Sequence, residues 1–88
     1  MGAHIDPDEL NRFTNRLEEY IQNVNDETDA FKRALSDVNE TWNDEKYNEF
    51  EEVFTELERV VRAFTEQAED EVPRLRRMEE DIRDYGSR

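Results

Sequence analysis

The chain has 88 residues, of which 34% are hydrophobic and 42% are charged, and its 25 acidic and 12 basic residues give a formal net charge of -13. Two glycines, two prolines and so little apolar material exclude a turn-rich β-protein and a flexible low-complexity chain, and they favour long helices. The acidic charge repels nucleic-acid phosphates and anionic lipid headgroups, so we expect no nucleic-acid partner, and any charged partner should be basic.

Segments that direct a protein to a membrane are not evident in the sequence. No run of about 18 apolar residues could span a bilayer, and the N-terminus lacks the basic region and apolar core of a cleaved signal peptide. The chain also has no cysteine, so it can form no disulfide. We therefore expect a protein that is cytoplasmic at synthesis and not inserted in a membrane. Secretion by a route that reads a folded helical pair would leave no such signal.

The first predicted element is a helix over about residues 7–40. Asp6 can accept hydrogen bonds from the first free backbone amides, Pro7 suits the first helical position, and Glu9 has the capping-box spacing from Asp6. Apolar residues then follow one stripe of this helix, as in an amphipathic helix that packs against a neighbour. The stripe contains Leu10, Phe13, Leu17, Tyr20, Ile21, Val24, Phe31, Ala34, Leu35, Val38 and Trp42.

A turn is predicted at about residues 41–45, where the apolar pattern stops. Asn43 or Asp44 can cap the helix that follows, and acidic residues are favourable in its first turn. A short connection makes the two helices antiparallel neighbours.

The second predicted helix covers about residues 46–85. A seven-residue repeat predicts coiled-coil-like packing, although Glu71 interrupts the apolar stripe and could pair with Arg74 or Arg76, contact a basic partner or reach solvent. Pro73 should kink or break the helix, because it lacks an amide donor and clashes with the preceding turn, so the segment after it could lean away. The stripe contains Tyr47, Phe50, Phe54, Leu57, Val61, Phe64, Ala68, Leu75, Met78, Ile82 and Tyr85.

These elements predict an all-α fold in which residues 1–88 form one antiparallel two-helix hairpin. Two rods cannot bury so many aromatic side chains, so we expect a second hairpin to complete a four-helix bundle on dimerisation. The residues predicted for the core and the dimer seam are Leu10, Phe13, Leu17, Ile21, Phe31, Leu35, Tyr47, Phe50, Phe54, Leu57, Val61 and Phe64.

Chemistry-bearing patterns are sparse in the sequence. Trp42 could close the end of the hairpin or anchor a partner, and the phenylalanines of the second helix could line a cavity or simply form the seam. The acidic clusters lack the glycine-turned pattern of a calcium loop, and the single histidine, His4, precedes the first helix. We therefore expect no cofactor, no metal and no enzymatic activity.

Taken together, two helices of similar length and a tryptophan at the turn resemble the WXG family of small type VII secretion proteins. The turn Trp42-Asn43-Asp44 resembles the Trp-x-Asp variant, with Asp44 in place of the family's glycine. The C-terminal Tyr-x-x-x-Asp/Glu export signal is missing, because only three residues follow Tyr85, and the same spacing between Tyr47 and Glu51 falls inside a helix.

This resemblance implies a dimeric substrate, chaperone or adaptor of a type VII-like secretion system, a homodimer or a heterodimer with a related hairpin. A secretion ATPase or an effector would be a further partner. The alternative is an intracellular acidic coiled-coil module that inhibits a basic partner such as a toxin.

Overall fold

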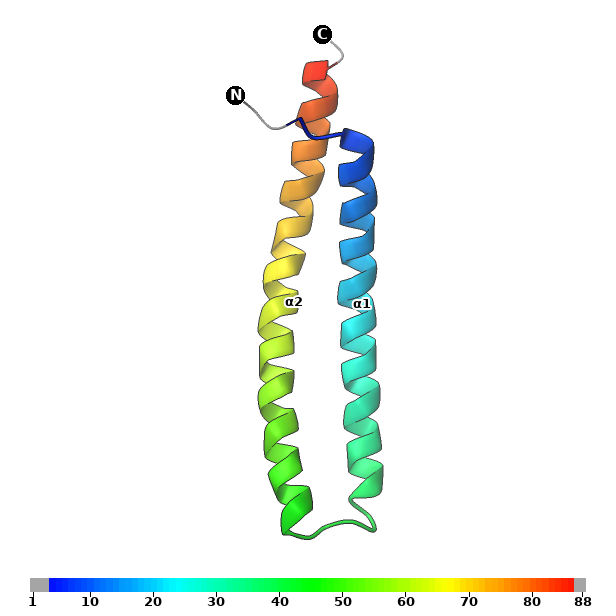
Figure 1. The fold of residues 1–88 in the computed structure, drawn as a ribbon, viewed down its shortest axis with the longest axis vertical. Helices are drawn as coiled ribbons and strands as arrows, with labels where there is room; N and C mark the ends of the chain where they lie inside the picture. Colours follow the sequence, from blue (N-terminus) through cyan, green and yellow to red (C-terminus); the bar gives the residue numbers. More distant parts are fainter. Residues whose placement is uncertain (1–3, 87–88) are drawn as a thin grey trace.

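The computed structural model describes residues 4–86 and shows a helical hairpin. Helix α1 spans Pro7–Val38 and helix α2 spans Glu45–Gly86, and residues 4–86 contain no strand. The helices lie side by side and antiparallel, with the turn at one end and both termini at the other (Figure 1). The molecule measures 66 × 21 × 16 Å, which is one helix long and two helices wide. The ends of the predicted 1–88 unit, residues 1–3 and 87–88, lie outside the described residues.

The start of α1 is capped as the sequence predicts. The Asp6 carboxylate accepts a 2.9 Å hydrogen bond from the backbone amide of Asp8, and the Asp6 carbonyl accepts from the amide of Leu10 at 3.0 Å. Pro7 occupies the first turn, where its missing N–H costs nothing. The helix ends two residues before the predicted boundary, because residues 39–41 form a tighter turn after Val38.

Helix α2 continues through Pro73 without a break, which corrects the expectation that the helix could end there. The segment after Pro73 does not lean away from α1. Its residues Arg76, Glu79 and Arg83 bond to side chains of α1, and α2 curves along α1 in Figure 1. These contacts hold the segment after Pro73 against α1.

The core is a narrow line of side chains between the two helices. Its buried hydrophobic residues are few, because each helix turns only one narrow stripe toward the other. Two threonines complete the line, and Thr14 is the most deeply buried residue, with 0% of its surface exposed. The buried residues are Leu10, Thr14, Ile21, Leu35, Tyr47, Phe54, Thr65 and Ala68.

Candidate functional site

Large apolar side chains gather on one side of the hairpin and remain exposed. Tyr20 of α1 meets Phe64 of α2 edge to face, with ring centroids 6.0 Å apart, and Phe31 lies 6.2 Å from Phe50. These ring contacts cross from helix to helix, so both helices contribute to the same surface. We call it the apolar face and define it as Phe13, Leu17, Tyr20, Phe31, Phe50, Val53, Leu57 and Phe64.

Two grooves run along the apolar face between the helices, with volumes of about 400 and 410 Å³. The turn-side groove is lined by Phe31, Phe50, Val53, Phe54, Leu57, Thr28 and Glu27. The open-end groove is lined by Phe13, Leu17, Phe64, Gln67, Ala68, Leu75 and Glu71. Each groove therefore combines apolar walls with a single carboxylate.

The predicted seam residues divide into two sets in the structure. Leu10, Ile21, Leu35, Tyr47 and Phe54 are buried between α1 and α2. Leu17 and Val61 are partly buried. The remaining five are 41–59% exposed in the single hairpin and so lie on its surface, namely Phe13, Phe31, Phe50, Leu57 and Phe64.

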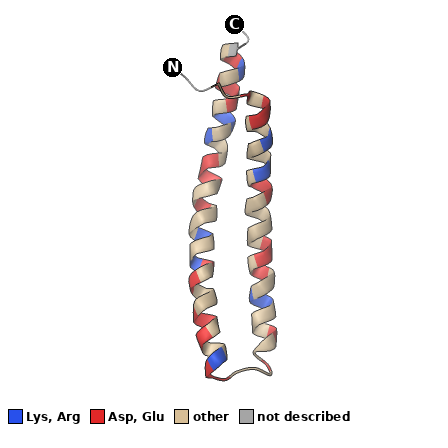
Figure 2. Ribbon diagram, in the orientation of Figure 1, with Lys and Arg blue, Asp and Glu red and all other residues tan. Residues whose placement is uncertain are grey.

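The opposite side of the hairpin is polar. With 3.6 residues per turn, positions 11, 18 and 29 of α1 fall on the other side of the helix contact from positions 13, 20 and 31. Both signs of charge occur on the two helices, and acidic residues occur along the full length of both (Figure 2). Its cross-helix pairs are Lys32–Glu58 at 3.2 Å, Arg62–Asp29 at 3.7 Å, Arg83–Asp8 at 2.9 Å, Asn11–Glu79 at 3.1 Å and Arg76–Glu18.

Hydrogen bonds within α2 and across to α1 lower the pKa of two carboxyl groups on the polar face. Hydrogen bonds from Arg62 and Lys32 lower the pKa of Glu58. Hydrogen bonds from Asn11 and Arg83 lower the pKa of Glu79. Exposed ion pairs contribute little to the free energy of folding, but a wrong register between the helices would break the bonds from Lys32 and Asn11 of α1. The polar face therefore favours one alignment of the hairpin.

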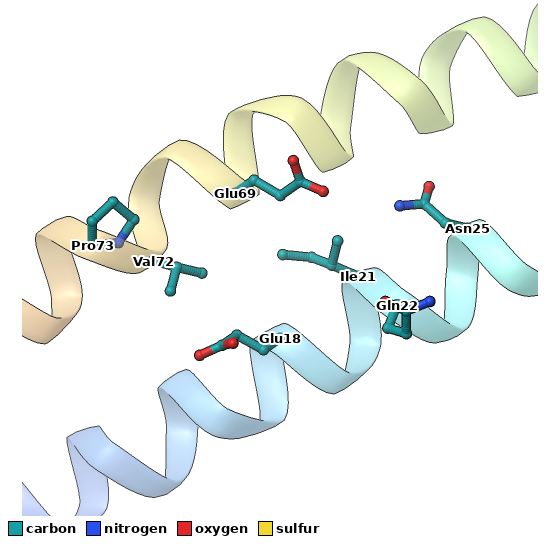
Figure 3. Close-up of a pocket in the computed structure, with 7 residues that line it drawn as sticks. All are labelled: Glu18, Ile21, Gln22, Asn25, Glu69, Val72 and Pro73. Atoms are coloured by element: carbon teal, nitrogen blue, oxygen red, sulfur yellow. The ribbon is translucent and has the colours of Figure 1, made fainter.

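A shallow hollow of about 280 Å³ lies on the polar face beside Pro73. Ile21 and Val72 point toward each other across its floor, and Glu18, Gln22, Asn25 and Glu69 surround it (Figure 3). Because Pro73 has no N–H, the carbonyl of Glu69 loses its helical donor at this point. The lining holds carboxylates and amides but no histidine or hydroxyl, so it offers no nucleophile with an adjacent base.

Asp44 organises the turn. Its Oδ1 accepts a 3.1 Å hydrogen bond from the backbone amide of Tyr47, as an N-cap of α2 does, and a 2.8 Å bond from the indole Nε1 of Trp42. The Trp42 ring packs edge to face on Tyr47, with centroids 5.5 Å apart. Of the two predicted caps, Asn43 and Asp44, the structure therefore selects Asp44. Trp42 is partly buried against the cluster of Leu35, Tyr47 and Phe54, where it closes this end of the hairpin.

Tyr47 connects the turn to the core. Its hydroxyl donates to the carbonyl of Leu35 at 3.4 Å or to the carboxylate of Glu51 at 3.2 Å. Burial raises the pKa of Tyr47, and the adjacent Glu51 carboxylate raises it further. The Tyr47–Glu51 pair, which has the spacing of an export signal, is therefore engaged within α2.

Sequence reasoning missed the buried threonines. The hydroxyl of Thr14 donates to the carbonyl of Leu10 at 2.8 Å, and that of Thr65 donates to the carbonyl of Arg62 at 3.1 Å. Bonding to the preceding helical turn satisfies the hydroxyl and allows a polar side chain to occupy the core. Both residues are spaced by three or four positions from apolar neighbours, which is the signal that could have placed them there.

Among residues 4–86 the structure contains no group of three or more histidine, cysteine or acidic side chains arranged to hold a metal ion. Neither of the described helices has a stretch long and apolar enough to cross a membrane. The described surface therefore consists of a long apolar strip, a polar strip on the other side of the hairpin, and a turn that is held by the hydrogen bonds of Asp44.

Comparisons with protein-family models, with curated proteins and with solved structures found no match to this chain. The resemblance to the WXG family therefore rests on the helical pair and the turn residues alone.

Proposed function

We propose that the chain is a non-enzymatic docking module that completes a four-helix bundle by covering its apolar face with a second helical hairpin. The observation that supports this most strongly is the row of half-exposed aromatic rings in contact across α1 and α2. Contiguous exposed apolar surface of this kind marks interaction sites in proteins that are otherwise rich in charge. The seven-residue repeat suits the near-parallel packing of helices in bundles.

The cellular setting that the turn suggests is a type VII-like secretion system, in which the module would serve as a dimeric substrate, chaperone or adaptor. In this setting the apolar face would hold the two hairpins together. The turn around Trp42 and Asp44 would then remain at the exposed end of the bundle for contact with an ATPase or an effector. The motif supports this setting, and the docking proposal does not depend on it.

The test is whether the apolar face drives association once charge repulsion is removed. At about 1 M NaCl the screening length falls to about 3 Å, so two chains of charge -13 can approach each other. Light scattering at high protein concentration should then report twice the monomer mass. The double variant V53Q/L57Q, which changes two exposed apolar residues, should remain monomeric under the same conditions.

A matched control is E52Q/E80Q, because both glutamates are exposed and lie outside the apolar face. This control should associate as the wild-type chain does. A V53Q/L57Q variant that associates as well as the wild-type chain would contradict the proposal.

A further inference from the structure

The two grooves on the apolar face each include one acidic side chain, at the places where a partner would sit. Glu27 lies in the turn-side groove and Glu71 in the open-end groove, and neither lysine nor arginine lines either groove. Within the described part of the chain, the Glu27 side chain has no hydrogen-bond or ion-pair partner. The Glu71 carboxylate forms an ion pair with Arg74 of the same helix at 3.0 Å. Both carboxylates are exposed in the single hairpin and would be covered when the face is covered.

A second copy of this chain suits these carboxylates poorly. It would bring the same two grooves, with the same two acids and no base among their lining residues. Arg16 and Lys46 already pair with acids of their own helix, Arg16 with Glu19 at 3.5 Å and Lys46 with Glu49 at 3.8 Å. Glu71 already has Arg74 beside it, but Glu27 would be covered without a counter-charge, which is unfavourable. Each copy also brings a net charge of -13, which opposes the approach of a second copy.

We propose that the occupant of the apolar face is a helical hairpin from a different, basic chain. Lysine or arginine residues at the edge of its apolar stripe would meet Glu27 and Glu71. This inference rests on the proposed docking function and adds the chemistry of the partner. The apolar contacts would supply most of the affinity, and the two glutamates would select a basic partner over an acidic one, including a second copy.

The test uses two synthetic helical hairpins that share length and leucine stripe and differ only at the flanking positions. One probe has lysine at these positions and the other has glutamate. Titrations in about 0.15 M NaCl, where the screening length is about 8 Å, should show that the lysine probe binds at least about tenfold tighter than the glutamate probe. This preference should shrink in about 1 M NaCl, because salt screens the charges.

The variant E27Q/E71Q should lose most of this preference and should self-associate more readily than the wild-type chain. The control E52Q/E80Q changes the net charge by the same amount at exposed positions outside the apolar face, and it should keep the preference. The comparison separates a local effect of the two grooves from a general attraction between opposite net charges. All four substitutions place glutamine at exposed helical positions, where it suits a helix as well as glutamate does.

Three results would overturn the inference: equal binding of the two probes, an equal loss of preference in E52Q/E80Q, or a wild-type dimer that is tighter than the complex with the lysine probe. The last result would leave the docking function intact and make a second copy the occupant. Failure of the docking function itself has a different signature. In that case V53Q/L57Q would bind the lysine probe as tightly as the wild-type chain does.

Discussion

Replacing Asp44 with alanine should destabilise the hairpin more than its exposed position suggests. One carboxylate oxygen, Oδ1, accepts both the amide of Tyr47 and the indole of Trp42, at 3.1 and 2.8 Å. Loss of an N-cap costs about 1 kcal/mol. Loss of the indole bond adds about 0.5–1 kcal/mol, toward the low end because Trp42 is only partly buried and its indole can turn to water.

The expected total for D44A is about 1.5–2 kcal/mol of unfolding free energy, which corresponds to a fall in Tm of about 6–16 °C for a chain of this size. Urea and thermal unfolding followed by circular dichroism would measure it. The control is D44N, which retains a side-chain oxygen for both bonds and should lose much less.

A double-mutant cycle with W42F isolates the indole bond, because phenylalanine keeps a ring against Tyr47 but has no N–H. In the W42F background, D44A should cost about 0.5–1 kcal/mol less than in the wild-type chain. A D44A variant within about 0.5 kcal/mol of the wild type would refute the assignment of Asp44 as the organiser of the turn.

Three further predictions test the core, the proline and the cross-helix pairs. Phe54→Ala should lower the free energy of unfolding by about 3–5 kcal/mol, because Phe54 is only 5% exposed. Phe64 is 45% exposed, so Phe64→Ala should cost less than half as much in the free hairpin. Equal losses in urea unfolding would contradict the division into core and apolar face. Pro73→Ala should raise the free energy of unfolding by about 1–3 kcal/mol, because it restores a hydrogen-bond donor to the Glu69 carbonyl. A lower Tm for this variant would instead mean that the proline suits the curvature of α2. The pKa of Glu79 is lowered in the fold, so its contribution is present above the ordinary value of 4.5 and is lost as the pH falls through the folded value. The difference in Tm between wild type and E79Q should therefore shrink below pH 4.5, and a difference that grows there would contradict the pairing.

The elements of the hairpin could be predicted because their signals are local. Asp6 and Pro7 mark a helix start by backbone geometry alone, and an apolar stripe needs no knowledge of its partner to indicate a helix. Of the two effects expected of Pro73, a kink or a break, the break was wrong for the opposite reason. Whether α2 tolerates a proline depends on contacts from Arg76, Glu79 and Arg83 to a helix more than fifty residues away in sequence.

The sequence does not show which residues of the apolar stripes are buried in the core and which lie on the apolar face. Each apolar stripe is wider than the surface that one neighbouring helix can cover. The periodicity therefore identifies the residues of the stripe but not which of them face the other helix. Phe54 and Phe64 have the same residue type on the same helix, yet only Phe54 lies on the line of contact. Which of the two is buried depends on the rotation of α2 about its own axis. The ring contacts and the cross-helix bonds together determine this rotation.

The two faces together limit how the hairpin can assemble. A module with apolar surface on both sides could stack without end, because each added copy would expose a new apolar side. Here one side carries ring contacts and grooves, and the other carries charged pairs that water solvates well. In the proposed complex, a second hairpin with the same division of faces would leave a polar surface on both outer sides and would attract no further hairpin. The same division of side chains that leaves the single hairpin incompletely buried therefore favours a closed bundle over a fibre.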